Sequence, residues 1–235
     1  MTLEIVDSGA ASGTENMRRD IELCERVRAG EISPTLRLYT WTPWCISLGK
    51  HQNTSSIDMS AVDAAGFDVV HRPTGGRAVL HADEVTYCVC VPVRDALDAR
   101  RIYAEVHQIL FRALTSLVPD LSYATVDHDL RQHYAASGPL GQVCFTSHAR
   151  TEILWHGKKI VGSAQRVLEG VVLQHGSILC GNGHERLAEC ITAETADRRR
   201  LLDSITASSA TLTDAAGHSI TQHDVITAIM RQNRQ

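Results

Sequence analysis

The chain is best approached from the stretch His71-Arg72-Pro73-Thr74-Gly75-Gly76-Arg77-Ala78-Val79-Leu80-His81, which sets a glycine turn between two positively charged arms. Vicinal glycines reach backbone dihedral angles that are closed to other residues, and they let a ligand lie against bare main chain. Arg72, Arg77 and His81 would surround such a ligand with hydrogen-bond donors. Taken alone, the segment is equally typical of an ordinary hairpin with a Gly-Gly turn.

Three further motifs follow the glycine turn in the sequence. A cysteine stands in the setting Gln142-Val143-Cys144-Phe145, residues 157–166 read Gly-Lys-Lys-Ile-Val-Gly-Ser-Ala-Gln-Arg, and residues 172–179 read Val-Leu-Gln-His-Gly-Ser-Ile-Leu. With these motifs the chain resembles the superfamily of biotin/lipoate ligases and octanoyltransferases, and within it the cysteine-dependent octanoyltransferase branch. The resemblance covers residues 3–179, and the C-terminal portion carries no motif that we can place.

Length and composition indicate a globular protein of 235 residues in one domain, with a motif-bearing core at about 3–180 and a helical C-terminal portion at 181–235. No apolar run approaches the roughly 20 residues of a membrane helix, and the acidic N-terminal flank is unlike a signal peptide. Seven cysteines without framework spacing predict free thiols, so we expect a cytoplasmic protein. A net charge of −4 predicts no general attraction to nucleic acid.

Hydrophobic periodicity and turn residues predict an α+β fold, a mixed sheet with helices packed on it, because strands and helices interleave without regular β-α-β alternation. The resemblance implies the catalytic-domain fold of class II synthetases and biotin/lipoate ligases. The chain should hold a mobile polar loop at 127–141. We expect helices at 12–30, 58–65, 98–117, 185–191, 196–204 and 222–231, and strands at 36–39, 45–48, 67–71, 85–93, 151–155, 159–167 and 171–179.

Cys144 is the candidate nucleophile. The residues alone favour an inert core cysteine beside Phe145, whereas the resemblance implies a thiol that carries the acyl group as a thioester. The resemblance also implies that Lys159 points into the active site, where a cation stabilises the thiolate and shuttles the proton of the attacking amine. Lys158, its neighbour on a strand, should face the other side.

The expected substrate site combines the glycine turn with the small residues of the later motif. Main-chain N–H groups and small side chains there would let a lipid chain pack closely and would hold a developing oxyanion. His175 is more often a structural residue than a pocket residue, and the histidines form no metal-binding pattern, so we expect no metal. The expected substrate-binding residues are Arg72, Thr74, Gly75, Gly76, Arg77, His81, Gly162, Ser163 and Ala164.

Three features depart from the family pattern. The first helix keeps Asn16 and Asp20 of the family's motif but carries Ile21 in place of its glutamate. The family's Pro-Ser and tyrosine are absent before Glu152, where residues 148–151 read His-Ala-Arg-Thr. Both departures leave open whether the acyl group is octanoyl or lipoyl. The chain also ends soon after its core, which argues against the large accessory domain of many ATP-dependent lipoate ligases.

The resemblance implies an acyltransferase that moves an octanoyl group from acyl carrier protein, through Cys144, to a lysine of a lipoyl-accepting domain in lipoate biosynthesis. The acceptors would be lipoyl domains of 2-oxoacid dehydrogenases or the glycine cleavage H protein. One alternative uses the H protein as the acyl donor, and another is an ATP-dependent lipoate ligase in which Cys144 is incidental. A catalytically silent lipoyl-domain binder is a third. We expect no cofactor, with ATP and magnesium needed only by the ligase, and neither nucleic acid nor membrane as a partner.

Overall fold

The computed structural model describes residues 1–125 and 151–232. Cys144 and the polar stretch 127–141 therefore lie outside the described residues. The strands are β1 (Glu4–Ala11), β2 (Thr35–Trp41), β3 (Cys45–Leu48), β4 (Asp68–His71), β5 (Val79–His81), β6 (Glu84–Pro92), β7 (Ser122–Thr125), β8 (Thr151–Trp155), β9 (Lys158–Lys159), β10 (Val161–Leu168) and β11 (Val171–Leu179). The helices are α1 (Gly13–Arg28), η1 (Thr54–Ser56), α2 (Met59–Ala65), α3 (Ala96–Thr115), η3 (Asn182–Cys190), α5 (Thr195–Ser208), α6 (Leu212–Ala216) and α7 (Gln222–Arg231).

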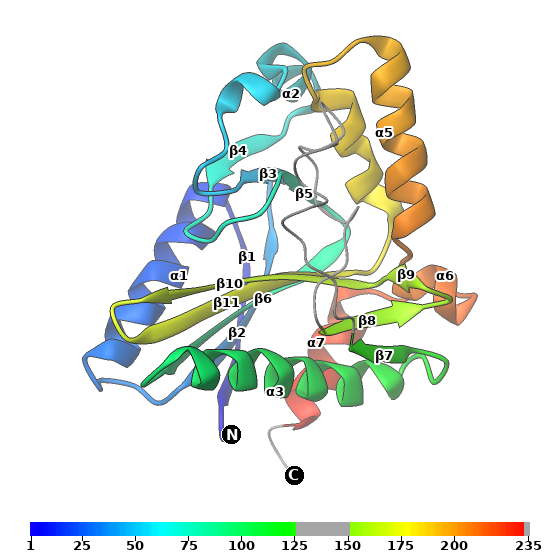
Figure 1. Ribbon diagram of the computed structural model, residues 1–235. Helices are drawn as coiled ribbons and strands as arrows, with labels where there is room; N and C mark the ends of the chain where they lie inside the picture. The colour runs from blue at the N-terminus through cyan, green and yellow to red at the C-terminus, as the bar shows by residue number, and fades with distance from the viewer. Residues whose placement is uncertain (126–150, 233–235) are drawn as a thin grey trace.

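The central sheet is mixed and has five strands in the order β1-β2-β6-β11-β10. The edge strand β1 pairs parallel to β2, and the remaining neighbours are antiparallel (Figure 1). This arrangement confirms the predicted α+β fold with a mixed sheet. Strand β1 itself was not expected from the sequence.

Helices cover both faces of the central sheet (Figure 1). On one face, Val106 and Leu110 of α3 and Ile229 of α7 share a core with apolar residues of β2 and β6. On the other face, α1 packs its apolar stripe against a second core that contains Cys88 and Cys90. The two cysteines thus lie on one side of β6 as buried residues, as alternate positions of a strand do.

Local signals fix where the first two helices begin and end. The Ser12 side chain accepts a hydrogen bond from the N–H of Glu15 at 3.4 Å, which caps α1. Asp58 caps α2 in the same way through the N–H of Ala61, and α2 ends at Gly66, whose φ of 69° is left-handed. Both helices were predicted from these residues.

The glycine turn joins two strands that do not pair with each other. In the second sheet, of order β4-β3-β5, strand β3 lies between β4 and β5, parallel to the first and antiparallel to the second. The segment from Arg72 to Ala78 therefore crosses over the end of β3. The alternative of an ordinary Gly-Gly hairpin is wrong for this chain, because β4 and β5 form their ladders with a shared neighbour.

The C-terminal portion is tied to the motif-bearing core. Side chains of η3 and α5 join a core with the second sheet and α2, and Val225 of α7 joins the core under α3. In the third sheet, β7-β8-β9, the N–H of Ala210 donates to the carbonyl of Lys159 at 3.0 Å, beside a parallel bridge between Lys159 and Ser209. Within the described residues, no helix combines the length and the hydropathy of a membrane span.

Candidate active site

Arg72 holds the glycine turn from inside the protein. Its buried guanidinium donates to the Ser47 carbonyl and hydroxyl at 2.8 and 3.1 Å, to the Gly75 carbonyl at 3.2 and 2.9 Å, and to the Arg77 carbonyl at 2.7 Å. A planar fork of donors suits several fixed carbonyls at once. In this structure Arg72 therefore directs these donors to Ser47 of β3 and to the main chain of the turn, and its contact with a substrate stays a prediction.

Close main-chain packing explains why glycines occur at the turn. A Cβ atom on Gly49, just beyond the end of β3, would lie 2.0 Å from the carbonyl oxygen of Gly76. Gly76 has a φ of 95°, which side-chain-bearing residues rarely adopt. The N–H of Lys50 donates to the Thr74 carbonyl at 2.9 Å and fixes the turn from the same side. The close approach therefore explains Gly49, and the positive φ of Gly76 agrees with the backbone freedom expected of the vicinal glycines.

His81 is a buried residue with partners on both ring nitrogens. Nε2 lies 2.7 Å from the Ser47 hydroxyl, and Nδ1 lies 2.7 Å from a carboxylate oxygen of Glu84. The ring stacks on Trp41 with centroids 4.3 Å apart and planes at 12°. His81 therefore supports the Ser47 hydroxyl, which in turn accepts from Arg72. Its place among the substrate-binding residues stays a prediction.

Thr74 is linked to the first helix through a buried polar chain. Its hydroxyl lies 2.5 Å from Nε2 of His175, and Nδ1 of His175 lies 3.6 Å from the carboxylate of Asp20. The same carboxylate accepts from Arg37 at 2.6 Å and from the Tyr39 hydroxyl at 2.8 Å. The family-type aspartate of α1 is thereby connected to the glycine turn, a link that the sequence motif alone does not reveal.

Strand β10 places its motif residues on opposite faces of the central sheet. Ala164 is opposite His175 in the β10–β11 register, and the Arg166 guanidinium donates to the Pro73 carbonyl at 2.9 Å, so this face meets the glycine turn. Ser163 alternates with them and turns toward α3. The small residues that we expected to act together are therefore divided. Ala164 lies near the turn, while the Ser163 side chain does not share its face.

Ser163 belongs to a polar chain under α3 that the sequence did not suggest. Nδ1 of His107 lies 3.0 Å from the Tyr103 carbonyl, so this nitrogen carries the proton. Burial lowers the pKa of His107 to about 4, and the positive charge of Lys159 acts in the same direction. The neutral ring then accepts the Ser163 hydroxyl proton at Nε2, 3.0 Å away, and Tyr87 donates to Ser163 at 2.6 Å.

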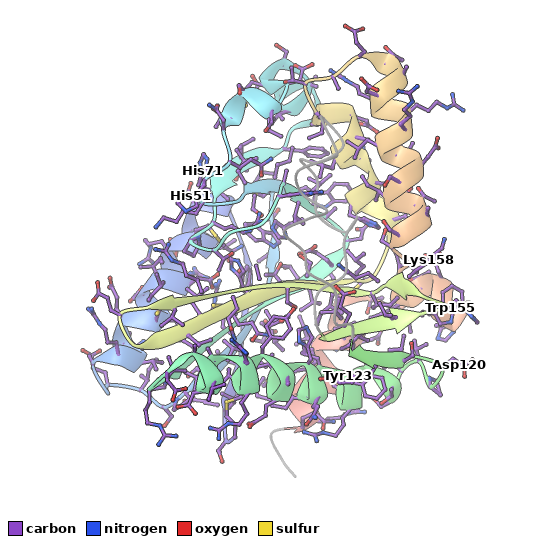
Figure 2. The ribbon with its side chains drawn as sticks, viewed as in Figure 1. His51, His71, Asp120, Tyr123, Trp155 and Lys158 are labelled. Carbon is purple, nitrogen blue, oxygen red and sulfur yellow. The ribbon has the colours of Figure 1, made fainter. Side chains whose placement is uncertain are left out.

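Lys159 is buried and forms an ion pair with Glu152. Its ammonium nitrogen lies 2.7 Å from the carboxylate, and both side chains are less than a tenth exposed. Lys158 points elsewhere and donates to the Thr206 carbonyl at 2.9 Å, beside the end of α5 (Figure 2). The predicted difference in orientation between the two lysines is confirmed. In the sequence, Glu152 was noted only as a residue of the family pattern. Its ion pair with Lys159 forms because β8 and β9 pair as antiparallel strands.

The described cysteines are all free and buried: Cys24, Cys45, Cys88, Cys90, Cys180 and Cys190. Burial raises the pKa of Cys88 to about 11 and of Cys180 to about 12, and it also raises the pKa of Cys45 and Cys190. The pKa of Cys24 is lowered because Cys90 hydrogen-bonds to it, but Cys24 is enclosed between α1 and the sheet. None of these six is an accessible nucleophile.

Among residues 1–125 and 151–232, no three His, Cys, Asp or Glu side chains gather closely enough to hold a metal ion.

Comparisons with known proteins identify the family. The model of the lipoyl protein ligase A/B catalytic domain matches residues 12–234. Octanoyltransferase LipM of Kyrpidia tusciae is 41% identical over 76% of this chain and 66% of its own length. Octanoyltransferase LipM of an Exiguobacterium species is 33% identical over 97% of this chain and 83% of its own length. The chain therefore belongs to the lipoyl protein ligase A/B catalytic-domain family.

Solved structures support the same fold. The bi-partite lipoate protein ligase of Thermoplasma acidophilum superposes with a TM-score of 0.72 at 18% identity, over 99% of this chain and 82% of that one. Lipoate-protein ligase A bound with ATP gives a TM-score of 0.69 at 20% identity, over 99% and 84%. These structures share the mixed-sheet catalytic-domain fold with this chain. Within the family, the curated relatives compared above are octanoyltransferases rather than ligases.

Proposed function

We propose that this acyltransferase moves an octanoyl group from acyl carrier protein to a lysine of a lipoyl-accepting domain, with Cys144 as the acyl carrier within the enzyme. The observation that carries the proposal is the 33% identity to octanoyltransferase LipM of the Exiguobacterium species over 97% of the chain. Further octanoyltransferases, from Symbiobacterium thermophilum and Staphylococcus aureus, are 34% and 36% identical. The ligase structures are no more than 20% identical, so octanoyl transfer fits better than ligation.

The reaction consists of two acyl exchanges at one thiol. The Cys144 thiolate attacks the donor thioester, the donor thiolate leaves, and the acyl group stays on Cys144 as a new thioester. The acceptor amine then attacks this thioester, loses a proton, and displaces the Cys144 thiolate to leave an amide. Each step begins from an activated acyl group, so neither requires ATP.

Lys159 is the residue that we propose to act with Cys144. A nearby cation favours the thiolate over the thiol and favours thiolate departure in the second step. The ion pair with Glu152 and the hydrogen bond from Ala210 to the Lys159 carbonyl fix the position of this lysine. Once this ammonium has given a proton to the departing donor thiolate, the neutral amine can receive the proton that the attacking acceptor amine loses. The burial of the six described cysteines leaves Cys144 as the candidate thiol.

The acceptor class follows from the family. The Thermoplasma acidophilum ligase was solved as part of a lipoylation system with its E2 lipoyl domain. Lipoyl-domain proteins are accordingly the partners of this enzyme, either domains of 2-oxoacid dehydrogenases or the glycine cleavage H protein. Acyl carrier protein as the donor is our proposal, and a transferase that takes the acyl group from the H protein is the competing arrangement.

The test is intact mass spectrometry of the protein mixed with octanoyl-acyl carrier protein and without ATP. We expect one octanoyl adduct on wild type, no adduct on Cys144→Ala, and a normal adduct on Cys190→Ala, which removes a buried thiol as a matched control. Addition of an apo lipoyl domain should discharge the adduct. Ligation of free lipoate that needs ATP and survives Cys144→Ala would replace this proposal by the ligase.

A further inference from the structure

A buried chain of polar side chains connects helix α1 to the glycine turn. Asn16 accepts from one terminal nitrogen of Arg37 at 2.6 Å, and Asp20 accepts from the other at 2.6 Å. Asp20 then faces His175 at 3.6 Å, and His175 contacts the Thr74 hydroxyl at 2.5 Å. All five side chains are less than a tenth exposed. Buried polar groups in such a chain strongly constrain one another, because each unmade hydrogen bond is costly.

The order hydroxyl, imidazole, carboxylate is also that of a hydrolase triad, yet the burial argues for another role. Thr74 is 0% exposed, so its hydroxyl cannot reach an acyl carbonyl in this arrangement. The main chain of Thr74, by contrast, is bound to Lys50, whose N–H donates to the Thr74 carbonyl. A hydroxyl directed into the protein interior anchors the turn, and the reacting groups must lie elsewhere.

The direction of the proton in this chain follows from the groups at its ends. The Asp20 carboxylate lies 3.6 Å from Nδ1 of His175, and its negative charge favours the tautomer that carries the proton on that nitrogen. Nε2 of the neutral ring is then an acceptor, and the Thr74 hydroxyl donates to it at 2.5 Å. The carboxylate thus favours the tautomer in which the Thr74 hydroxyl donates to His175.

We propose that His175 is a positioning residue of the acyl-transfer site, which holds the Pro73–Gly76 turn in place by accepting a hydrogen bond from the Thr74 hydroxyl, with Asp20 favouring the tautomer that accepts it. The kinetic part of this inference rests on the proposed octanoyl transfer, because the turn is part of its expected acyl site. The tautomer is a property of the free protein and does not depend on the reaction.

The surroundings of His175 favour the neutral ring. Asp20 of α1 favours the charged form, whereas Arg72 and His81 on the side of the second sheet oppose it. On the central sheet, His175 is paired in register with Cys88, whose thiol is protonated at neutral pH because burial raises its pKa to about 11. Burial has the largest effect and lowers the pKa of His175, which leaves Nε2 free to accept.

The first experiment compares substitutions at Thr74 by the rate of octanoyl-adduct formation and by thermal unfolding. Thr74→Val keeps the shape but loses the hydroxyl, and we expect a rate roughly 10- to 100-fold lower, because a displaced turn misplaces the substrate. Thr74→Ser restores the donor and should stay within about threefold of wild type, since one retained hydrogen bond fixes the turn. Thr35→Val, which removes a buried hydroxyl at the start of β2, is the matched control. Equal rates for the two valine variants, or no rescue by serine, would overturn the role.

The second experiment measures the His175 tautomer by nitrogen-15 NMR of the free protein, with the signal assigned through His175→Gln. We expect a protonated Nδ1 and an unprotonated Nε2 at neutral pH in wild type. In Asp20→Asn the amide can donate to Nδ1, so we expect the proton to move to Nε2 and octanoylation to slow. A proton on Nε2 in wild type contradicts the proposal even when an octanoyl adduct forms. Absence of any adduct on wild type, with the tautomer as expected, contradicts only the proposed function.

Discussion

Variants of Lys159 and Glu152 can separate the contribution of Lys159 to stability from its proposed role in acyl transfer. Lys159→Ala leaves the Glu152 carboxylate, which is 2% exposed, without the cation that lies 2.7 Å away. Breaking a buried pair by removing one partner typically costs about 3–5 kcal/mol. For a chain of this size, each kcal/mol corresponds to about 2–4 °C in Tm, so the melting temperature should fall by roughly 6–20 °C.

The double variant Lys159→Met, Glu152→Leu should recover most of that loss. Replacing both members of a buried pair by apolar residues of similar volume is often neutral or stabilising. We expect the double variant to melt near wild type and yet to form no octanoyl adduct, because it lacks the cation that we propose to stabilise the thiolate. Lys158→Ala, at the neighbouring position, should change stability by less than about 0.5 kcal/mol and keep its activity.

The assay is a double-mutant cycle of thermal unfolding, with mass spectrometry of the octanoyl adduct on each variant. An active double variant would refute a chemical role for Lys159. A Lys159→Ala protein as stable as wild type would refute the buried pair as a structural element. Equal losses of activity at Lys158 and Lys159 would show that the alternation of the two side chains has no functional consequence.

Three further outcomes follow from the geometry. Gly49→Ala should destabilise by about 1–3 kcal/mol, because its Cβ would meet the Gly76 carbonyl, whereas Gly75→Ala, with nothing within 4 Å of the added Cβ, should melt within about 0.5 kcal/mol of wild type. Gly76→Ala, at a φ of 95°, should cost about 1–2 kcal/mol and slow adduct formation, both measurable on one preparation. The His107 pKa of about 4 lies below its unfolded value near 6.5, so its contribution is complete above pH 6.5 and is lost as pH falls toward 4. Between pH 6.5 and 4 the free energy of unfolding from urea titrations should fall by roughly 3 kcal/mol because of His107. In His107→Gln the fall should be smaller, and an equal fall in both proteins would contradict this role of His107.

Much of the fold could be predicted from local sequence, and the failures have physical causes. Hydrophobic periodicity and turn residues located β3, α1, α2 and α7, whose signals lie within or next to their own residues. The segment Glu4–Ala11 was missed because, as an edge strand, it buries few of its residues. The helix Leu212–Ala216 was also missed, because its five residues are too few to show a helical period of hydrophobic side chains. The path of the glycine turn over β3 depends on pairing between distant strands, which no local pattern contains.

For the candidate site, the structure shows how the predicted residues are oriented, while their roles stay predictions. A period of two correctly separated Lys158 from Lys159, because it depends only on strand geometry. The same period sets Ser163 apart from Ala164, but which face meets the turn depends on the register with β11. The hydrogen bonds of Arg72 and His81 to groups of the protein could not be predicted, because their partners Ser47 and Glu84 are brought close only by the folded chain. The role of Cys144 stays a prediction, since it lies outside the described residues.

The hydrogen bond from Ala210 to the carbonyl of Lys159 sets a limit on how far the enzyme can be shortened. The family motifs end near residue 179, so a gene designer guided by motifs would cut the chain at that point. Such a fragment would lose the main-chain partner of Lys159, together with the α5 carbonyl that receives Lys158. The smallest working catalyst should therefore include residues beyond the short motifs, and libraries built to vary this enzyme should treat its last helices as part of the catalytic unit.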